Sequence, residues 1–562
     1  MIRPDLYENY ENTRVIHYSE LDEIMGPGVA WDGLEDTELS GIPLDIQRRE
    51  DGKLYVHTIP DTHVLTIGAT RCGKTQSFVI PYAKFLTMRK NKCSMVLTDP
   101  KLELFRALSP TLIRQGYRVI HLNFTDSENS DRWNPLSKIY DIYQEYATVE
   151  DRVNAVVEGE DYYNEFCGRI YRDLHSLECA INTKKRTLLA KVQSKVEELA
   201  QILCEAGSDK DITWMNGGRA IFKGIIYAML EDSVPGGKNP LITRENFSFD
   251  TLLNIFDRIG GSRCDFTDRY FKQRNKKTSL AYKEVAKYLF IKAEVTRDGF
   301  VSTLATAMTK LKDGAIRDIT CANTFEFSEF EDGSRPVAIF ISMKDETKLY
   351  YDIISLFLTD LYSTLIDMTR KNDNRPRKNP FYFILDEFGN MPEFRDFDTV
   401  VSSCGGRNIW FWLVIQSYAQ LKNVYGDKSE VVKDNLNMHI YLGTNNPETK
   451  QSFSNECGRK SVISPLSALN GDGEFIDHYV REEVAAVPVS RLSKMEIGEC
   501  IITRMNADVV WSRLERYYTC PEMIEEPNEK CRYVSSFEPG DPKYEYNLSA
   551  VDDDDDDDDD LF

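Results

Sequence analysis

The sequence predicts an α/β protein with a parallel β-sheet and a large inserted all-α domain. Short apolar segments of strand type alternate with helical segments in two separate parts of the chain, and such alternation is typical of a parallel sheet. Between these parts, residues 137–330 have mainly helical period, best seen in the stripe from Leu188 to Leu203. We therefore expect one α/β domain that is split by a helical insertion. The predicted strands are residues 63–67, 94–98, 117–122, 337–341, 381–385, 409–415 and 439–443.

The length of 562 residues predicts two or three domains. A hairpin signal, Asp51-Gly52 between two alternating segments, leads into the first strand of the sheet. The end of the chain loses periodicity and contains nine consecutive aspartates, Asp552 to Asp560, followed by Leu561 and Phe562. We expect an N-terminal segment at 1–56, the two halves of the α/β domain at 57–136 and 331–520, the insert at 137–330, and an acidic, disordered tail at 521–562.

Composition favours a soluble, cytoplasmic protein. No apolar run reaches the ~18–20 residues of a membrane span, and the first fifty residues contain no signal peptide. The twelve cysteines form no C-x-x-C pair, which indicates reduced thiols rather than a zinc site or a disulfide framework. The formal net charge is −22. Any contact with nucleic acid must therefore be made by a local basic patch.

Residues 68–75 match the pattern G-x-x-x-x-G-K-[ST] between a strand and a helix. In this motif, glycines let successive backbone N–H groups point at one phosphate, and the new helix adds its positive end. Lys74 is placed to reach the β- and γ-phosphates, and the Thr75 hydroxyl to ligate Mg²⁺. The alternative, a chance glycine turn, is disfavoured by the flanking strand and helix. The predicted ATP site consists of Gly68, Ala69, Thr70, Arg71, Cys72, Gly73, Lys74 and Thr75.

A second motif ends the apolar strand 381–385, where Asp386 and Glu387 follow. A buried strand that ends in an acid is the usual form of a Walker B motif, in which Asp386 would hold Mg²⁺ through its water shell. Glu387 would then polarise the attacking water. An acidic pair at a strand end can equally be a solvated terminus. Its pairing with the P-loop favours the catalytic interpretation.

Two further side chains are candidates for catalysis. Gln416 ends the strand 409–415, where its amide would bond the attacking water or sense the γ-phosphate. The alternative is an ordinary strand-end amide. Arg407 lies on a glycine turn, and an arginine supplied across a subunit interface can stabilise transition-state charge. Sequence alone favours a surface role for Arg407.

The most basic stretch of the chain, residues 269–287, lies within the insert. Seven basic side chains face a single acid there, and aromatic residues are interleaved. A solvated helix face is one interpretation, and contact with a nucleic-acid phosphate backbone is the other. The candidate contacts are Lys272, Arg274, Lys276 and Lys277.

The motifs occur in a characteristic order along the chain. The P-loop is followed by Asp99-Pro100-Lys101, then Trp133–Leu136, the helical insert, Asp386-Glu387, Gly406–Ile409 and Ile415–Ser417. This series, over roughly residues 55–520, resembles the type IV secretion coupling proteins, which are TraG-like ATPases of conjugative DNA transfer. The resemblance implies a RecA-like P-loop domain with an all-α insert, and it assigns Gln416 as a sensor.

The resemblance also implies partners. They are single-stranded DNA with its relaxase, the membrane subunit of a secretion channel, and five further copies in a homo-hexamer, with a monomer as the alternative for the isolated chain. The chain has no N-terminal transmembrane helices of the kind common in the family, so we expect a peripheral position at the inner face of the membrane through a partner. Leu102 stands where the family motif Asp-Pro-Lys-Gly-Glu has glycine. Two alternatives remain: a ring-shaped DNA translocase of segregation or repair type, and a nucleotide-gated adaptor with little hydrolysis.

Overall fold

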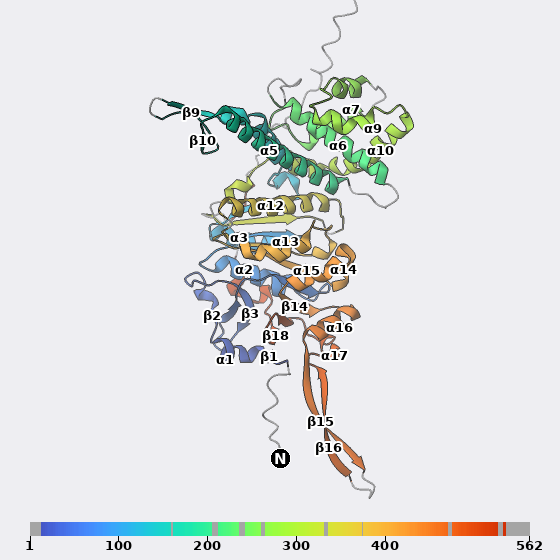
Figure 1. The fold of residues 1–562 in the computed structure, drawn as a ribbon. Coiled ribbons are helices and arrows are strands. Elements are labelled where there is room, and N and C mark those ends of the chain that lie inside the picture. Colours follow the sequence, from blue (N-terminus) through green and yellow to red (C-terminus); the bar gives the residue numbers. More distant parts are fainter. Residues whose placement is uncertain are drawn as a thin grey trace, which may run out of the picture. The chain divides into compact units, whose positions relative to one another are not determined.

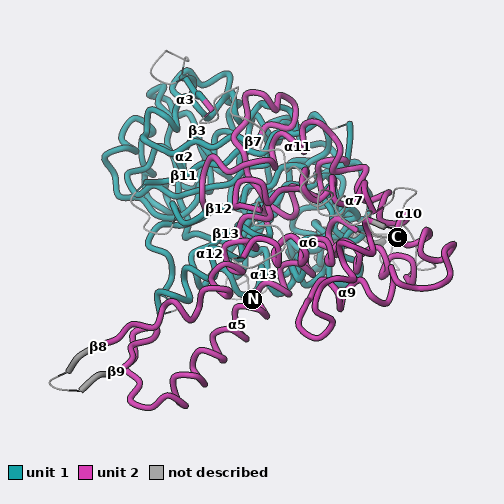
Figure 2. The backbone as a smooth tube through the Cα atoms, turned by 90° about the horizontal axis from the view of Figure 1, so that it is seen from above, with its two compact units in different colours: residues 1–122, 327–348, 359–534 teal, residues 123–326, 349–358, 535–562 magenta. Residues whose placement is uncertain are grey.

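The computed structural model describes most of the chain, and its residues form two compact units. The first unit comprises residues 1–122, 327–348 and 359–534, and the second comprises residues 123–326, 349–358 and 535–562 (Figure 2). Among the described residues, no helix is both long enough and apolar enough to cross a bilayer. The predicted acidic run 552–560 lies outside the described residues. The structure describes residues 13–158, 161–204, 212–234, 242–259, 265–330, 335–344, 346–373, 375–469, 475–525 and 532–535.

The first unit is built on a ten-stranded mixed sheet (Figure 1). Its central strands run parallel, in the order β14-β5-β13-β12-β6-β11, and β17 joins antiparallel beside β14. All seven predicted strands are present in this sheet, each within one residue of its expected limits. From one edge to the other, the strands are β1 (Val15–His17), β18 (Val509–Arg513), β17 (Glu499–Arg504), β14 (Met438–Gly443), β5 (Val64–Gly68), β13 (Ile409–Ile415), β12 (Phe381–Leu385), β6 (Ser94–Asp99), β11 (Val337–Ser342) and β7 (Arg118–Asn123).

Helices cover both faces of this sheet because the strands are apolar on both sides, as expected for parallel strands. On one face, Phe78 and Tyr82 pack against Trp412 of β13, with ring centroids 5.0 and 5.5 Å away. On the other face, Phe397 packs edge-on against Phe411 at 5.1 Å. The helices of this unit are α1 (Leu21–Met25), α2 (Ile80–Met88), α3 (Glu103–Arg114), residues 359–371 of α12 (Tyr351–Lys371), α13 (Phe397–Cys404), α14 (Tyr418–Tyr425), α15 (Lys428–Asn435), α16 (Pro447–Glu456) and α17 (Val489–Leu492).

Two smaller sheets also belong to the first unit. The predicted hairpin around Asp51-Gly52 is confirmed as β3 (Ile42–Arg48) and β4 (Leu54–Ile59), joined by the short β2 (Val29–Ala30). A long hairpin, β15 (Arg459–Leu469) and β16 (Phe475–Ala485), forms a separate two-stranded sheet. Ordered structure continues into the predicted tail, where Arg48 pairs with Glu522 at 2.7 Å.

The second unit is mainly helical, but one correction to the all-α prediction is needed. Residues 154–171 form a three-stranded antiparallel sheet, β8 (Asn154–Glu158), β9 (Asp161–Phe166) and β10 (Arg169–Tyr171). The last of these strands has only three residues, too few to produce a clear period. The predicted stripe from Leu188 to Leu203 is the buried face of α5. The helices are α4 (Ser137–Ala147), α5 (Leu174–Leu203), α6 (Ile212–Asp232), α7 (Phe249–Ile259), α8 (Asp265–Thr267), α9 (Leu280–Leu289), α10 (Glu294–Leu311) and α11 (Gly314–Thr320).

Candidate functional site

The P-loop follows β5 at the carboxyl edge of the sheet and leads into a π-helical turn, Lys74–Val79. Two glycines make its path possible. A Cβ on Gly68 would lie 2.6 Å from Cγ of Lys74, and Gly73 has a φ of 94°, which favours glycine. Lys74 is buried beneath the loop, at 6% exposure. The loop is therefore wrapped closely around the stem of its own lysine.

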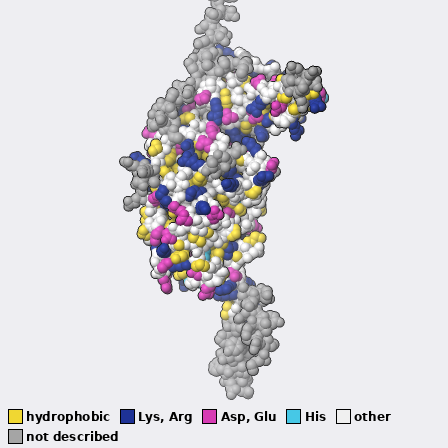
Figure 3. Space-filling model, turned by 90° about the vertical axis from the view of Figure 1, so that its left-hand side faces the viewer, with side chains coloured by type: hydrophobic (Ala, Val, Ile, Leu, Met, Phe, Trp, Pro, Cys, Tyr) yellow, Lys and Arg dark blue, Asp and Glu magenta, His cyan; other side chains and the backbone are white. Residues whose placement is uncertain are grey.

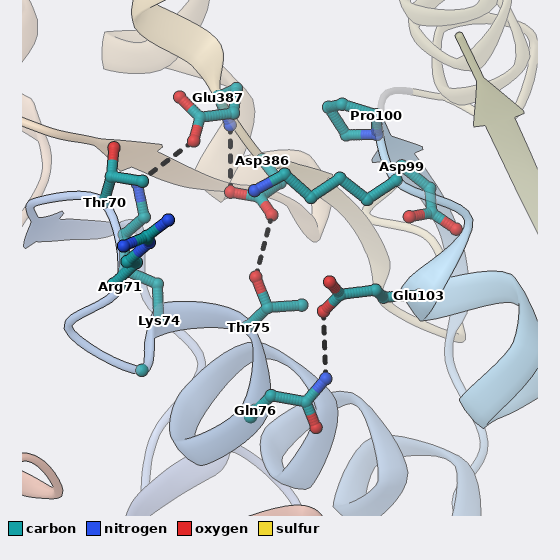
Figure 4. Close-up of a pocket in the computed structure, with 12 residues that line it drawn as sticks. Thr70, Arg71, Lys74, Thr75, Gln76, Asp99, Pro100, Glu103, Asp386 and Glu387 are labelled. Atoms are coloured by element: carbon teal, nitrogen blue, oxygen red, sulfur yellow. Dashed lines mark hydrogen bonds and ion pairs between the residues drawn. The ribbon is translucent and has the colours of Figure 1, made fainter. Parts of the chain in front are cut away.

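The sheet brings the two predicted halves of the site together (Figure 4). Lys74 Nζ lies 3.2 Å from Oε1 of Glu387, and the Thr75 hydroxyl lies 3.4 Å from Oδ2 of Asp386. These contacts arise because β5 and β12 run parallel with β13 between them, so their carboxyl ends meet at the same edge. Such edges of open α/β sheets are where ligands bind. The P-loop and the Asp386-Glu387 pair thus form one site.

The Glu387 carboxylate is held from several sides. Its Oε2 atom accepts from Nε2 of Gln416 at 3.0 Å and from Nδ2 of Asn390 at 3.4 Å, while Oε1 faces Lys74. Glu387 itself has a φ of 53°, an uncommon conformation for a residue with a side chain. Such strain is often found at functional sites, where surrounding contacts maintain it. Gln416 reaches Glu387 because it follows β13, the strand next to β12.

The P-loop, the Asp386-Glu387 pair and the segment after β6 line one pocket of about 400 Å³. Asp99, the last residue of β6, contributes together with Pro100, Lys101 and Glu103 from the segment that follows. Glu103 also accepts a hydrogen bond from the Gln76 amide at 2.9 Å, which links this segment to the P-loop helix (Figure 4). The motif around Asp99 therefore belongs to the same site as the two nucleotide-binding motifs.

Both aspartates of the pocket are buried, and burial raises the pKa of Asp386 and that of Asp99 to about 6. The Lys74 charge opposes this rise at Asp386, and the N–H of Phe105, bound to Asp99 at 2.8 Å, opposes it at Asp99. A divalent cation would favour the charged carboxylates. The hydroxyl of Thr75 and the carboxylate of Asp386 are hard oxygen donors, so these two residues fit Mg²⁺.

Leu102, the departure from the family motif, has a strained backbone. Its φ is 59°, and it directly precedes α3. Only glycine adopts this conformation without steric cost, which explains the family's preference at this position. The chain keeps the fold of the motif here and tolerates the strain.

Arg407 is not close to the P-loop of its own chain. It lies on a turn before β13, whereas Gln416 and the P-loop follow the carboxyl ends of the parallel strands β13 and β5. Its Nη1 atom donates to the carbonyl of Ser403 at 2.9 Å. An action across a subunit boundary therefore stays a prediction.

In the second unit, the basic segment 269–287 comprises a short helix end, a turn and α9 rather than one helix. Arg274 is not available at its surface. Its side chain is 7% exposed, and it pairs with Asp232 at 2.7 Å and Glu231 at 3.1 Å. The proposed contact of Arg274 with phosphates needs correction, because a guanidinium already bound to two acids serves the packing of α6 against this turn.

The three candidate lysines of the segment, Lys272, Lys276 and Lys277, are exposed. Lys272 pairs with Asp268 one turn earlier, and Lys276 and Lys277 lie on the turn before α9. Two of the interleaved aromatics, Tyr270 and Phe271, are buried and cannot stack with bases. On the face drawn in Figure 3, Lys and Arg side chains are interspersed with Asp and Glu. Phosphate contact by Lys272, Lys276 and Lys277 remains a prediction.

Three residues that contact Glu387 or Gln416 lie outside the sequence motifs. Asn390 follows Glu387 by three positions, a spacing that can place two polar side chains together on a turn. Gln420 follows Gln416 by four positions, and its side chain contacts the main chain of Gln416. Thr444, which follows β14, also contacts the main chain of Gln416. For Thr444, no local pattern in the sequence indicates this proximity.

Comparison with known proteins matches residues 37–467 to the family model described as type IV secretory system conjugative DNA transfer. The chain belongs to this family. VirD4 of Agrobacterium fabrum is 18% identical over 450 residues, which cover 79% of this chain and 56% of VirD4. VirD4 of Rhizobium rhizogenes is likewise 18% identical, over 452 residues. This chain thus spans just over half the length of these relatives.

Solved structures of the bacterial conjugative coupling protein TrwB share the fold. An unbound form matches with a TM-score of 0.56 at 13% identity, covering 90% of this chain and 93% of that one. TrwB in complex with ADP and Mg²⁺ matches with a TM-score of 0.55 at 14% identity, covering 94% and 96%. The prediction of a coupling-protein fold, a P-loop α/β domain with a helical insert, is confirmed.

Proposed function

We propose that this chain is an ATP-hydrolysing coupling protein that recruits relaxase-bound single-stranded DNA and drives it into a type IV secretion channel. Family membership supports the DNA-transfer part of this proposal. The observation that carries the ATPase part is the convergence of Lys74, Thr75, Asp386, Glu387 and Gln416 at one edge of the sheet. A binding-only site would not require a carboxylate held beside the P-loop lysine.

Each of these residues has a distinct task. The P-loop amides and Lys74 bind and orient the phosphates, and Thr75 and Asp386 would hold Mg²⁺. When bound, Mg²⁺ neutralises charge on the phosphates. Glu387 polarises the attacking water as a general base, and the Gln416 amide keeps its carboxylate in place. ATP and Mg²⁺ are thus the proposed substrate and cofactor, in line with the ADP and Mg²⁺ bound by TrwB.

The proposed partners are single-stranded DNA, the relaxase and a membrane subunit of the channel, with a homo-hexamer as the active form. Family membership supports these partners. We place the protein at the inner face of the cell membrane, held there by a partner. A nucleotide-gated adaptor with little hydrolysis would need no general base. The Glu387 carboxylate, held by Lys74, Gln416 and Asn390, therefore favours an ATPase over an adaptor.

The decisive test separates binding from turnover. Glu387→Gln should bind ATP as the wild type does and lose at least about 100-fold in kcat, because an amide cannot take up a proton from water. Lys74→Ala should instead weaken nucleotide binding. Glu393→Gln, an exposed residue of the same loop, is the matched control and should keep wild-type turnover. Wild-type kcat in Glu387→Gln would refute the assignment.

A subunit-mixing experiment tests the proposed role of Arg407. Arg407→Ala and Lys74→Ala should each be inactive alone. Mixed oligomers contain some interfaces with an intact Lys74 on one side and an intact Arg407 on the other, so part of the ATPase activity should return. Mixtures as inactive as the separate variants would exclude action in trans.

A further inference from the structure

The main chain of Gln416 is held at both of its polar groups by side chains outside the motifs. Its N–H donates to Oε1 of Gln420 at 2.7 Å, and its carbonyl accepts from the hydroxyl of Thr444 at 2.9 Å. Its amide meanwhile donates to Glu387 at 3.0 Å. The direction in which this amide points therefore depends on a peptide that two other residues fix.

Gln420 also packs against the loop that carries Glu387. A Cβ added to Gly389 would lie 2.5 Å from Oε1 of Gln420 and 2.6 Å from its Cβ. Gln420 thus occupies space that exists only because residue 389 is glycine. Since Gly389 lies two residues after Glu387, Gln420 bridges the Glu387 loop and the start of α14.

Thr444 is connected to the P-loop through its neighbour Gly443. It follows Gly443, the last residue of β14, whose carbonyl accepts from the N–H of Ala69 at 2.7 Å. Gly443 has a φ of 127°, a conformation that favours glycine. Thr444 is itself buried, at 8% exposure. The end of β14 therefore contacts both the first turn of the P-loop and the peptide of Gln416.

We propose that Gln420 and Thr444 are positioning residues for ATP hydrolysis, which clamp the Gln416 peptide so that its amide orients the Glu387 carboxylate. This inference rests on the proposed function. The clamp connects the end of β14, next to the P-loop, with the general base. Because neither residue lines the phosphate pocket, their loss should affect turnover and leave nucleotide binding nearly unchanged.

A purely structural role must be distinguished from positioning, since Gln420 lies in the first turn of α14. Thr449 offers a matched control. Its hydroxyl accepts a hydrogen bond from the N–H of Tyr418 at 3.1 Å, so it satisfies a donor at the same helix start through a bond that does not involve Gln416. Thr449→Val should lower stability as much as the clamp variants do and keep kcat within about twofold of wild type.

The experiment compares steady-state ATPase kinetics and nucleotide affinity. Gln420→Met and Thr444→Val should each lower kcat about tenfold, with KM and ATP affinity within about twofold of wild type. Gln420→Glu and Thr444→Ser keep an acceptor and a hydroxyl, so each should recover most of the activity. Thermal unfolding of every variant checks that it is folded.

A double-mutant cycle decides whether the effect runs through Gln416. In a Gln416→Ala background, Gln420→Met and Thr444→Val should have no further effect on kcat, because no amide remains to be positioned. The proposed clamp would be refuted if these substitutions lowered kcat equally in both backgrounds, or if they left kcat unchanged in the wild-type background. The proposed ATPase function would still stand in that case if Glu387→Gln abolished turnover. A wild-type protein without ATPase activity would instead refute the proposed function and the clamp together.

Discussion

Residue type and spacing indicate both the nucleotide site and the basic segment 269–287, but only at the nucleotide site does the structure bring the two predicted motifs, the P-loop and Asp386-Glu387, into contact. At the nucleotide site, Lys74 lies 3.2 Å from Glu387, and the Thr75 hydroxyl lies 3.4 Å from Asp386. In the basic segment, Arg274 turns inward to Asp232 and Glu231. The two regions thus differ in how much a local pattern says about the direction of a side chain.

The reason lies in what each pattern constrains. A P-loop between a strand and a helix determines the backbone path, and the backbone path determines where the functional groups point. A run of basic residues constrains only the local charge. Which of its members stay in solvent depends on acids from other elements, here the end of α6.

The largest effect should come from breaking the Arg274 pairing. Arg274→Gln leaves two acids without a counter-charge in a largely buried position, and we expect a loss of about 3–5 kcal/mol in the unfolding free energy. Lys277→Gln, on the exposed turn nearby, should change it by less than about 0.5 kcal/mol. Chemical denaturation measures both. If Arg274→Gln were as stable as the wild type but bound DNA more weakly, the contrast between the two regions would fail.

Lowering the pH should destabilise the protein through the buried His63, which directly precedes β5. Its Nδ1 atom accepts the N–H of Phe411 at 3.0 Å, and burial lowers its pKa to about 4. Between pH 6.5 and 4, the unfolded chain binds a proton here that the folded chain does not, so stability falls as the pH falls. The expected loss is about 2 kcal/mol by pH 5. Above pH 6.5 this group has no effect.

The measurement is the difference in unfolding free energy between the wild type and His63→Asn from pH 7.5 to 5. Other titrating groups contribute equally to both proteins and cancel. The wild type should lose its advantage over the variant as the pH falls. A difference that stays constant across this range would contradict the assignment of a neutral, buried His63.

Strain at Leu102 predicts a smaller effect of opposite sign. Leu102→Gly should stabilise the first unit by about 0.5–1 kcal/mol, because glycine adopts the positive φ without steric cost. Leu102→Ala is the matched control, since it removes the side chain and keeps the strain. Thermal unfolding distinguishes the two variants. A variant Leu102→Gly no more stable than Leu102→Ala would show that the backbone here is not strained.

The smallest effect concerns the exposed lysines. Replacing Lys272, Lys276 and Lys277 with glutamine should reduce the slope of log affinity against log salt by about 0.7 for each phosphate of the single strand that the variant no longer binds. A control variant with Lys53, Lys90 and Lys428 replaced, which are similarly exposed, should keep the wild-type slope. Equal slopes for both variants would favour the interpretation of this segment as a solvated surface without phosphate contacts.

Much of this protein was determined by the sequence itself. The strand from Phe381 to Leu385 and the P-loop were predicted with their limits because an apolar run or a glycine pattern is a local property. The order of motifs also indicated the family. The short strand from Arg169 to Tyr171 escaped prediction because three residues carry no usable period.

Tertiary structure alone decided which groups became neighbours. Strand order placed β13 between β5 and β12, and so brought Gln416 to Glu387. It also brought Thr444, at the end of β14, to the carbonyl of Gln416. The burial of Arg274 was decided in the same way, by acids from α6. These outcomes depend on contacts between distant parts of the chain, which no local spacing of residues encodes.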